Sequence, residues 1–157
     1  PGGDTIAFAI PGAGEQVIQP VTGLPVVTDG VVIDGSTQVD GSGFPLVRID
    51  GGAAAAPSLY GLELDVASVG SSTVSKLAFT RWDTGSGAGL FVHGTGTALL
   101  TGNLIGTDLA GSAGLGNASG LIMQNASLVG GATGVADYLI KPVIAAGHVP
   151  LRNRLYA

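Results

Sequence analysis

The chain has 157 residues, of which 45% are hydrophobic and only 11% are charged, while glycine alone accounts for 28 residues. This length corresponds to about one domain with a single core. The net charge of −5, with only six lysines and arginines, excludes the basic stripe with which nucleic-acid-binding proteins neutralise phosphates. The absence of cysteine excludes disulfides and thiolate metal sites.

The residue types favour short strands over helices. Lysine occurs only at Lys76 and Lys141 and glutamate only at Glu15 and Glu63, whereas glycine, valine and threonine are plentiful. No long window shows the 3.6-residue period of an amphipathic helix, so we expect almost no helix. No apolar stretch is long enough for a transmembrane segment. The chain begins without an initiator Met, so we expect a mature product or a piece of a longer protein.

Strand-like runs are short and evenly placed, and Gly, Ser, Asp or Pro separates nearly all of them. In chain order, we expect strands at Thr5–Ile10, Val31–Asp34, Leu46–Asp50, Gly61–Val66, Val74–Phe79, Gly89–His93, Leu99–Ile105 and Gly120–Gln124.

A short motif recurs along the middle of the chain. The motif is Gly-Leu-x-apolar, where x is any residue. It begins at Gly61, Gly89 and Gly120, at intervals of 28 and 31 residues. A second strand type lies between these copies and repeats at an interval of 26 residues, so that three residues align in order with three others: Val74, Leu77 and Phe79 with Leu100, Asn103 and Ile105. Two alternating strand types at a nearly constant period indicate the stacked coils of a β-solenoid.

Apolar side chains alternate along each copy, which predicts one inward and one outward face. Coils stacked about 4.8 Å apart place like side chains above like. We therefore expect a short parallel β-helix whose buried columns are formed by Leu62, Leu64, Leu90, Val92, Leu121 and Met123. The outward columns are then Glu63 and Asp65, Phe91 and His93, and Ile122 and Gln124, with Glu63 and Asp65 exposed.

A longer motif runs from Gly102-Asn103-Leu104-Ile105-Gly106-Thr107-Asp108 to Gly116-Asn117 and Gly120-Leu121-Ile122. It resembles the GN-x-IGTD repeat of bacterial right-handed parallel β-helix proteins, and Asp4–Gly12, Val32–Gln38 and Leu46–Gly51 look similar to the same family. The resemblance covers roughly residues 4–131. It implies a right-handed parallel β-helix of few coils in a secreted or cell-surface protein, with a likeness to polysaccharide lyases and hydrolases in fold alone.

The resemblance ends near Asn125, which suggests a division of the chain. We expect β-helix coils over residues 1–136, with residues 1–50 as an N-terminal coil or cap and residues 51–136 as regular coils. Residues 137–157 lack the Gly-Asn pairs of the repeat but keep apolar runs. They are expected to form a divergent coil, a cap or an arm that packs on the solenoid or on another subunit.

The best candidates for acid–base chemistry are Asp65, His93 and Glu63, which the repeat places side by side on one outward face. With 11 acidic residues in the chain, a solvated charge ladder is the simpler interpretation. Phe91 could offer a stacking surface for sugars, as could Tyr60 and Trp82. For Trp82 the more common role is packing over the edge of a coil.

The remaining candidates point to structure. Asn103 is expected to point inward at a coil corner and bond to backbone groups. The Gly106–Ser119 loop holds one acid, Asp108, which makes it a weak calcium site. Asn117 and Asn125 each begin an Asn-Ala-Ser glycosylation pattern. We expect no organic cofactor and no required metal.

Two functions remain open. The first is a non-catalytic structural or adhesive module at the cell surface or outside the cell, in which self-association at open coil ends could build a layer or filament. The second is a carbohydrate-active or glycan-binding protein with a polysaccharide partner; an enzyme of this kind would be a polysaccharide lyase or a glycoside hydrolase. The first does not require a catalytic centre, and no nucleotide or serine-hydrolase motif favours another class.

Overall fold

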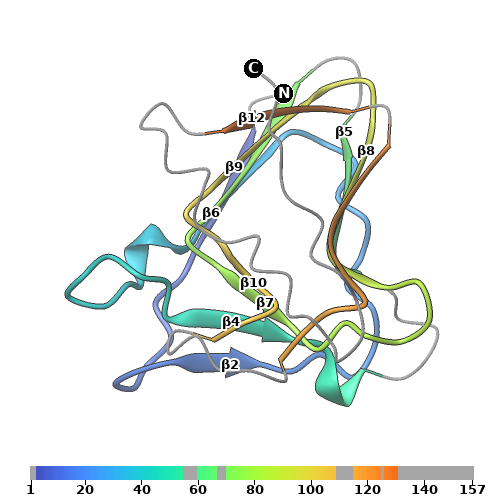
Figure 1. The fold of residues 1–157 in the computed structure, drawn as a ribbon. Coiled ribbons are helices and arrows are strands. Elements are labelled where there is room, and N and C mark those ends of the chain that lie inside the picture. Colours follow the sequence, from blue (N-terminus) through green and yellow to red (C-terminus); the bar gives the residue numbers. More distant parts are fainter. Residues whose placement is uncertain (1–2, 55–59, 67–69, 109–114, 125, 131–157) are drawn as a thin grey trace.

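The computed structural model describes residues 3–54, 60–66, 70–108, 115–124 and 126–130, the side chains of 127–130 excepted. Three parallel sheets form the walls of a β-solenoid of about 4 turns. The walls enclose a roughly triangular cross-section, as Figure 1 shows when the molecule is viewed nearly along its axis. The fold expected from the repeats, an all-β parallel solenoid of few coils, is therefore confirmed.

The chain passes through sheets A, B and C in turn, which explains why neighbours in a sheet are distant in sequence. Sheet A contains β1 (Asp4–Ala7), β3 (Val31–Asp34), β6 (Ser71–Ser75), β9 (Thr97–Thr101) and β12 (Ser127–Gly130). Sheet B contains β2 (Gln16–Ile18), β4 (Val47–Asp50), β7 (Ala78–Thr80) and β10 (Leu104–Ile105). Sheet C contains β5 (Tyr60–Val66), β8 (Ala88–Gly94) and β11 (Ser119–Gln124), and Val27 extends it by a bridge to Leu64.

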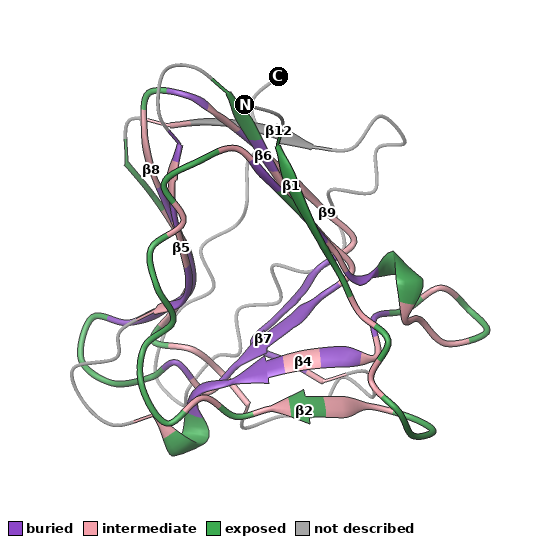
Figure 2. Ribbon diagram, turned by 180° about the vertical axis from the view of Figure 1, so that it is seen from behind, coloured by how far each residue is buried: buried purple, intermediate pink, exposed green. Residues whose placement is uncertain are grey.

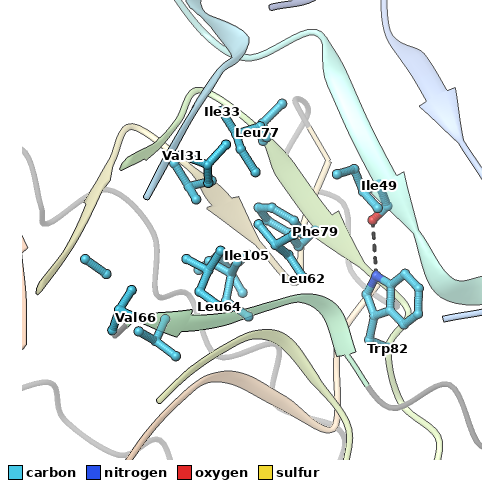
Figure 3. Packing of buried hydrophobic residues seen from close by; sticks show 14 of the residues in the cluster. Val31, Ile33, Ile49, Leu62, Leu64, Val66, Leu77, Phe79, Trp82 and Ile105 are labelled. Carbon is cyan, nitrogen blue, oxygen red and sulfur yellow. Dashed lines mark hydrogen bonds between the residues drawn. The ribbon is translucent and has the colours of Figure 1, made fainter. Parts of the chain in front are cut away.

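The core is the space between the three walls, where apolar side chains from successive coils stack in register (Figure 3). Of the six residues expected in the buried columns, Leu62, Leu64, Leu90 and Val92 are buried. The expectation is wrong for Met123, which is 37% exposed, and Leu121 is only half-buried. Both lie in β11, which pairs with β8 on one side only among the described strands and therefore forms the end of its columns.

The glycine of the repeated Gly-Leu motif makes room for the neighbouring corner. A Cβ atom on Gly61 would lie 2.5 Å from the Gly89 carbonyl oxygen and 2.7 Å from the indole nitrogen of Trp82. A Cβ atom on Gly89 would lie 2.7 Å from the Asn117 amide nitrogen. Only glycine allows these approaches without displacing backbone or a buried ring.

Two of the expected strands, Val74–Phe79 and Leu99–Ile105, are wrong because each contains a corner between sheets A and B. Lys76, with a φ of 54°, separates β6 from β7, and Gly102, with a φ of 61°, separates β9 from β10. A left-handed residue turns the chain and interrupts the extended backbone. The predicted alignment of these segments is correct, since Val74 pairs with Leu100 and Phe79 with Ile105.

The other strands agree more closely with expectation. Five of them coincide with the observed strands to within one residue, and Thr5–Ile10 overlaps β1. β2 and β12 were not expected. The described helices are two single 3-10 turns, η1 (Gly35–Thr37) and η2 (Gly51–Ala53), so the expectation of almost no helix is confirmed. Figure 2 shows where burial concentrates, with β7 buried throughout and β1 exposed throughout.

Candidate functional site

The three predicted acid–base residues lie together on the outer face of sheet C. Asp65 in β5 and His93 in β8 are cross-strand partners in adjacent coils, and Glu63 pairs with Phe91. The His93 ring lies between the two carboxylates, with Nε2 at 2.9 Å from Glu63 Oε1 and Nδ1 at 3.6 Å from Asp65 Oδ1. The predicted juxtaposition is thus observed.

Burial of these side chains differs from the simple expectation. The expectation that Glu63 and Asp65 are exposed is wrong, because both residues are half-buried, with side chains that are 24% and 44% exposed. Stacked coils bring side chains of neighbouring strands into contact, and Glu63 lies opposite Phe91 and bonds to His93, both in β8. The shorter contact is a hydrogen bond to Glu63, whereas 3.6 Å is too long for one.

Aromatic rings continue this face beside the carboxylates. The Tyr60 and Phe91 ring centroids are 4.7 Å apart, and the Phe91 and His93 centroids are also 4.7 Å apart. All three residues are half-buried. We call Tyr60, Phe91 and His93 the ring strip. It spans two successive coils, because β5 and β8 belong to adjacent turns.

The geometry of this face limits its chemistry. The imidazole separates Glu63 from Asp65, so the three groups do not converge on one point where a metal ion or a scissile bond could lie. Over the described residues no group of three or more His, Asp or Glu could hold a metal ion. Asp108, the weak calcium candidate, follows Thr107, whose hydroxyl bonds to the Asp108 carbonyl oxygen at 3.2 Å.

A second charged cluster, which the sequence did not reveal, lies on sheet B. The Asp50 side chain is fully buried and accepts hydrogen bonds from Arg81 Nη2 at 2.6 Å and Thr80 Oγ1 at 2.8 Å. Arg48 also bonds to Asp50 and reaches Glu15 Oε2 at 3.0 Å. Two positive and two negative charges therefore balance within one group that joins three coils.

Asp50 is strongly held in its ionised form. Burial by itself raises the pKa of this carboxyl, but hydrogen bonds from Arg81, Thr80, the Gly52 amide and Gln19 outweigh it and lower the pKa from 3.8 to about 2. The pKa of Arg81 is raised, chiefly by its hydrogen bond to Asp50. The cluster is an ion-paired group between coils, and both arginines in the described part of the chain, Arg48 and Arg81, belong to it.

Asparagine side chains form hydrogen bonds to the neighbouring coil at two corners. Asn103 Oδ1 accepts from the Leu77 amide at 3.0 Å, and its Nδ2 donates to the Val74 carbonyl at 2.8 Å, so the predicted structural role is confirmed. Asn117 Oδ1 accepts from the Trp82 amide at 3.0 Å, and its Nδ2 donates to the Phe79 carbonyl at 3.0 Å.

The first Asn-Ala-Ser pattern begins at Asn117, a half-buried asparagine whose amide nitrogen, the atom that would carry a sugar, bonds to the Phe79 carbonyl. The second pattern, at Asn125, lies outside the described residues. Asn117 follows a glycine just as Asn103 does, and this shared Gly-Asn pair was the sequence signal for its role.

Trp82 takes the packing role rather than a sugar-binding one. It is 1% exposed, and its indole nitrogen donates to the Ile49 carbonyl oxygen at 3.3 Å (Figure 3). Of the three candidate stacking residues, Tyr60 and Phe91 therefore remain at the surface.

Comparison of this chain with models of protein families, with curated proteins and with solved structures found no match. The solenoid assignment rests on the strand register of the chain itself. In the described part of the chain, no helix is long and apolar enough to cross a membrane.

Proposed function

We propose that this chain is a non-catalytic structural or adhesive module of an extracellular protein. The observation that carries the proposal is that side chains at the corners of the solenoid form hydrogen bonds between one coil and the next. Asp34 and Asp50 accept hydroxyl hydrogen bonds from Ser75 and Thr80 of the following coil. Together with the two asparagines described above, they connect the three coils that begin with β3, β6 and β9 at two corners. Satisfied polar networks of this kind stiffen a fold.

The candidate acid–base residues support the same proposal. Glu63 and His93 bond to each other, and the imidazole lies between Glu63 and Asp65. Polysaccharide lyase or glycoside hydrolase activity is therefore the less favoured function. Purified protein should release no reducing or unsaturated sugars from polysaccharides. Release that disappears in a Glu63→Gln variant would contradict the non-catalytic proposal.

The extracellular location is proposed from the sequence. The chain resembles the GN-x-IGTD repeats of secreted or cell-surface β-helix proteins, and its low content of charged residues leaves a surface covered mostly by small polar side chains and backbone. An antibody raised against the purified chain should label intact cells of the source organism or their culture medium. Labelling only after the cells are made permeable would contradict this location.

Self-association belongs to the same proposal. β1 and β2 are the first strands of their sheets, and each pairs with one described strand only. Apolar side chains beside these edges are exposed, including Ile6 at 48% and Val17 at 43%. Unpaired strand edges can accept another chain. Light scattering and electron microscopy of the purified chain should show oligomers or filaments, and a monomer at all concentrations would contradict self-association.

A second candidate function is glycan binding without catalysis. It is favoured by one observation, the half-buried ring strip on the outer face of sheet C. Its partner would be a polysaccharide, and the adhesive role would follow from that contact.

A further inference from the structure

We propose that the ring strip and the two carboxylates beside it form a binding platform for a sugar chain that is neutral or carries amino groups, and that this platform disfavours uronates. The inference rests on the adhesive part of the proposed function and specifies its ligand. It depends on Tyr60, Phe91, His93, Glu63 and Asp65.

The first argument is the position of Phe91. Its neighbours in β8, Leu90 and Val92, are fully buried in the core, so the alternation of the strand directs Phe91 to the outer face. No core column accommodates this ring. Tyr60 and His93 instead pack against it from the adjacent coil and from the same strand. The result is a surface of partly exposed rings, and aromatic faces of this kind stack on the apolar face of a pyranose.

The second argument is the supply of hydrogen-bond acceptors beside the rings. Glu63 is in register with Phe91, and Asp65 is in register with His93. Ionised carboxylates accept hydrogen bonds only, and sugar hydroxyl groups are donors that can meet them. Gln124, the cross-strand partner of His93 in β11, is exposed and adds an amide to the same face.

The third argument is charge, which selects the class of sugar. The strands of sheet C contain no lysine or arginine. Arg48 and Arg81 are bound to Asp50 on sheet B. The platform therefore carries negative charge that repels a uronate and attracts a protonated amine, which the ring faces also favour.

The test uses the full chain and four soluble oligosaccharide probes in isothermal titration calorimetry: cello-oligosaccharide, chito-oligosaccharide, deacetylated chito-oligosaccharide and oligogalacturonate. We expect binding of at least one of the first three probes and none of the uronate. Phe91→Ala should weaken binding roughly 10-fold, because an aromatic contact of this size is lost. Phe44→Ala is the control, since Phe44 is an exposed phenylalanine in the loop between η1 and β4, outside sheet C.

Thermal unfolding of both variants ensures that a folded protein is compared in each case. Glu63→Gln removes charge from the platform and should reduce the preference for the deacetylated over the acetylated chain. The proposal is overturned if no probe binds, if oligogalacturonate binds as well as the others, or if Phe91→Ala and Phe44→Ala have equal affinities. Surface labelling of intact cells together with absent sugar binding would refute this inference alone and leave the structural module standing.

Discussion

Asn103 and Asn117 make the same pair of hydrogen bonds to the coil beneath them, although they lie at different corners of the solenoid. Each side chain spans a residue with positive φ, Lys76 at 54° in one case and Arg81 at 58° in the other. Left-handed backbone is unfavourable for residues that carry a Cβ atom. The amide therefore holds a strained turn by satisfying the groups on both sides of it.

Replacement of either asparagine should destabilise the fold. Asn103→Ala and Asn117→Ala each leave a backbone amide and a backbone carbonyl without their partner, at a cost of about 1–3 kcal/mol in free energy of unfolding. Urea unfolding followed by circular dichroism measures this cost. Gln124→Ala removes an exposed amide and is the control. Equal midpoints for Asn103→Ala and Gln124→Ala would show that the bonds contribute nothing.

Acid should weaken the fold through Asp50. Its pKa is lowered from 3.8 to about 2 in the folded state, so the unfolded chain takes up the proton first as the pH falls. The ionised group stabilises the fold above about pH 4, by about 2 kcal/mol, and this contribution is lost as the pH falls through about 2.

The variant Asp50→Asn isolates that contribution. It should be less stable than the parent at neutral pH, and the difference in unfolding free energy should shrink between pH 5 and pH 2. Asp29→Asn, which removes an exposed carboxylate, is the matched control. If the parent and Asp50→Asn lose stability in parallel over this range, Asp50 does not supply the acid sensitivity.

A charge in the core should be far more costly than a charge on the outer face. Leu90→Asp places an unpaired carboxylate at a fully buried position and should cost about 4 kcal/mol or more. Val32→Asp introduces the same group at a position that is 37% exposed in sheet A and should cost much less. Thermal melting of both variants tests the inward column, and an unaltered melting curve for Leu90→Asp would refute it.

Chelation should leave stability unchanged. Among the described residues no cluster of metal-ligating side chains is present, and the sequence has no cysteine. Differential scanning calorimetry with and without EDTA should give the same Tm. A decrease of many degrees would reveal a metal site, and Asp108→Asn would then be the first variant to examine.

The C-terminal segment is expected to contribute to assembly. Residues 137–157 lie outside the described residues, but their sequence keeps apolar alternates around Arg152 and Arg154, as an edge strand would. Deletion of residues 150–157 should weaken self-association or expose an edge that aggregates. Light scattering of the parent and truncated chains measures this, and two monomers with equal Tm would contradict it.

The sequence alone was sufficient for the coil architecture. Alternation at period two directs Leu62, Leu64, Leu90 and Val92 inward, and the spacing of the Gly-Leu copies sets them above one another. The same spacing predicted that Asp65 pairs with His93 and that Asn103 points inward. These properties follow from local periodicity, which a single strand carries in its own residues.

Only the tertiary structure decided how the corners are built. The bond between Asp50 and Arg81 and the bond between Asn117 and Trp82 each join residues more than 30 positions apart, and the loops between them differ in length from coil to coil. Lysine and arginine are not residue types that favour a left-handed backbone, so the sequence does not mark Lys76 and Arg81 as corners; in the fold an asparagine of the next coil bonds to the backbone on both sides of each. Strand periodicity is local, whereas a corner depends on contacts between coils.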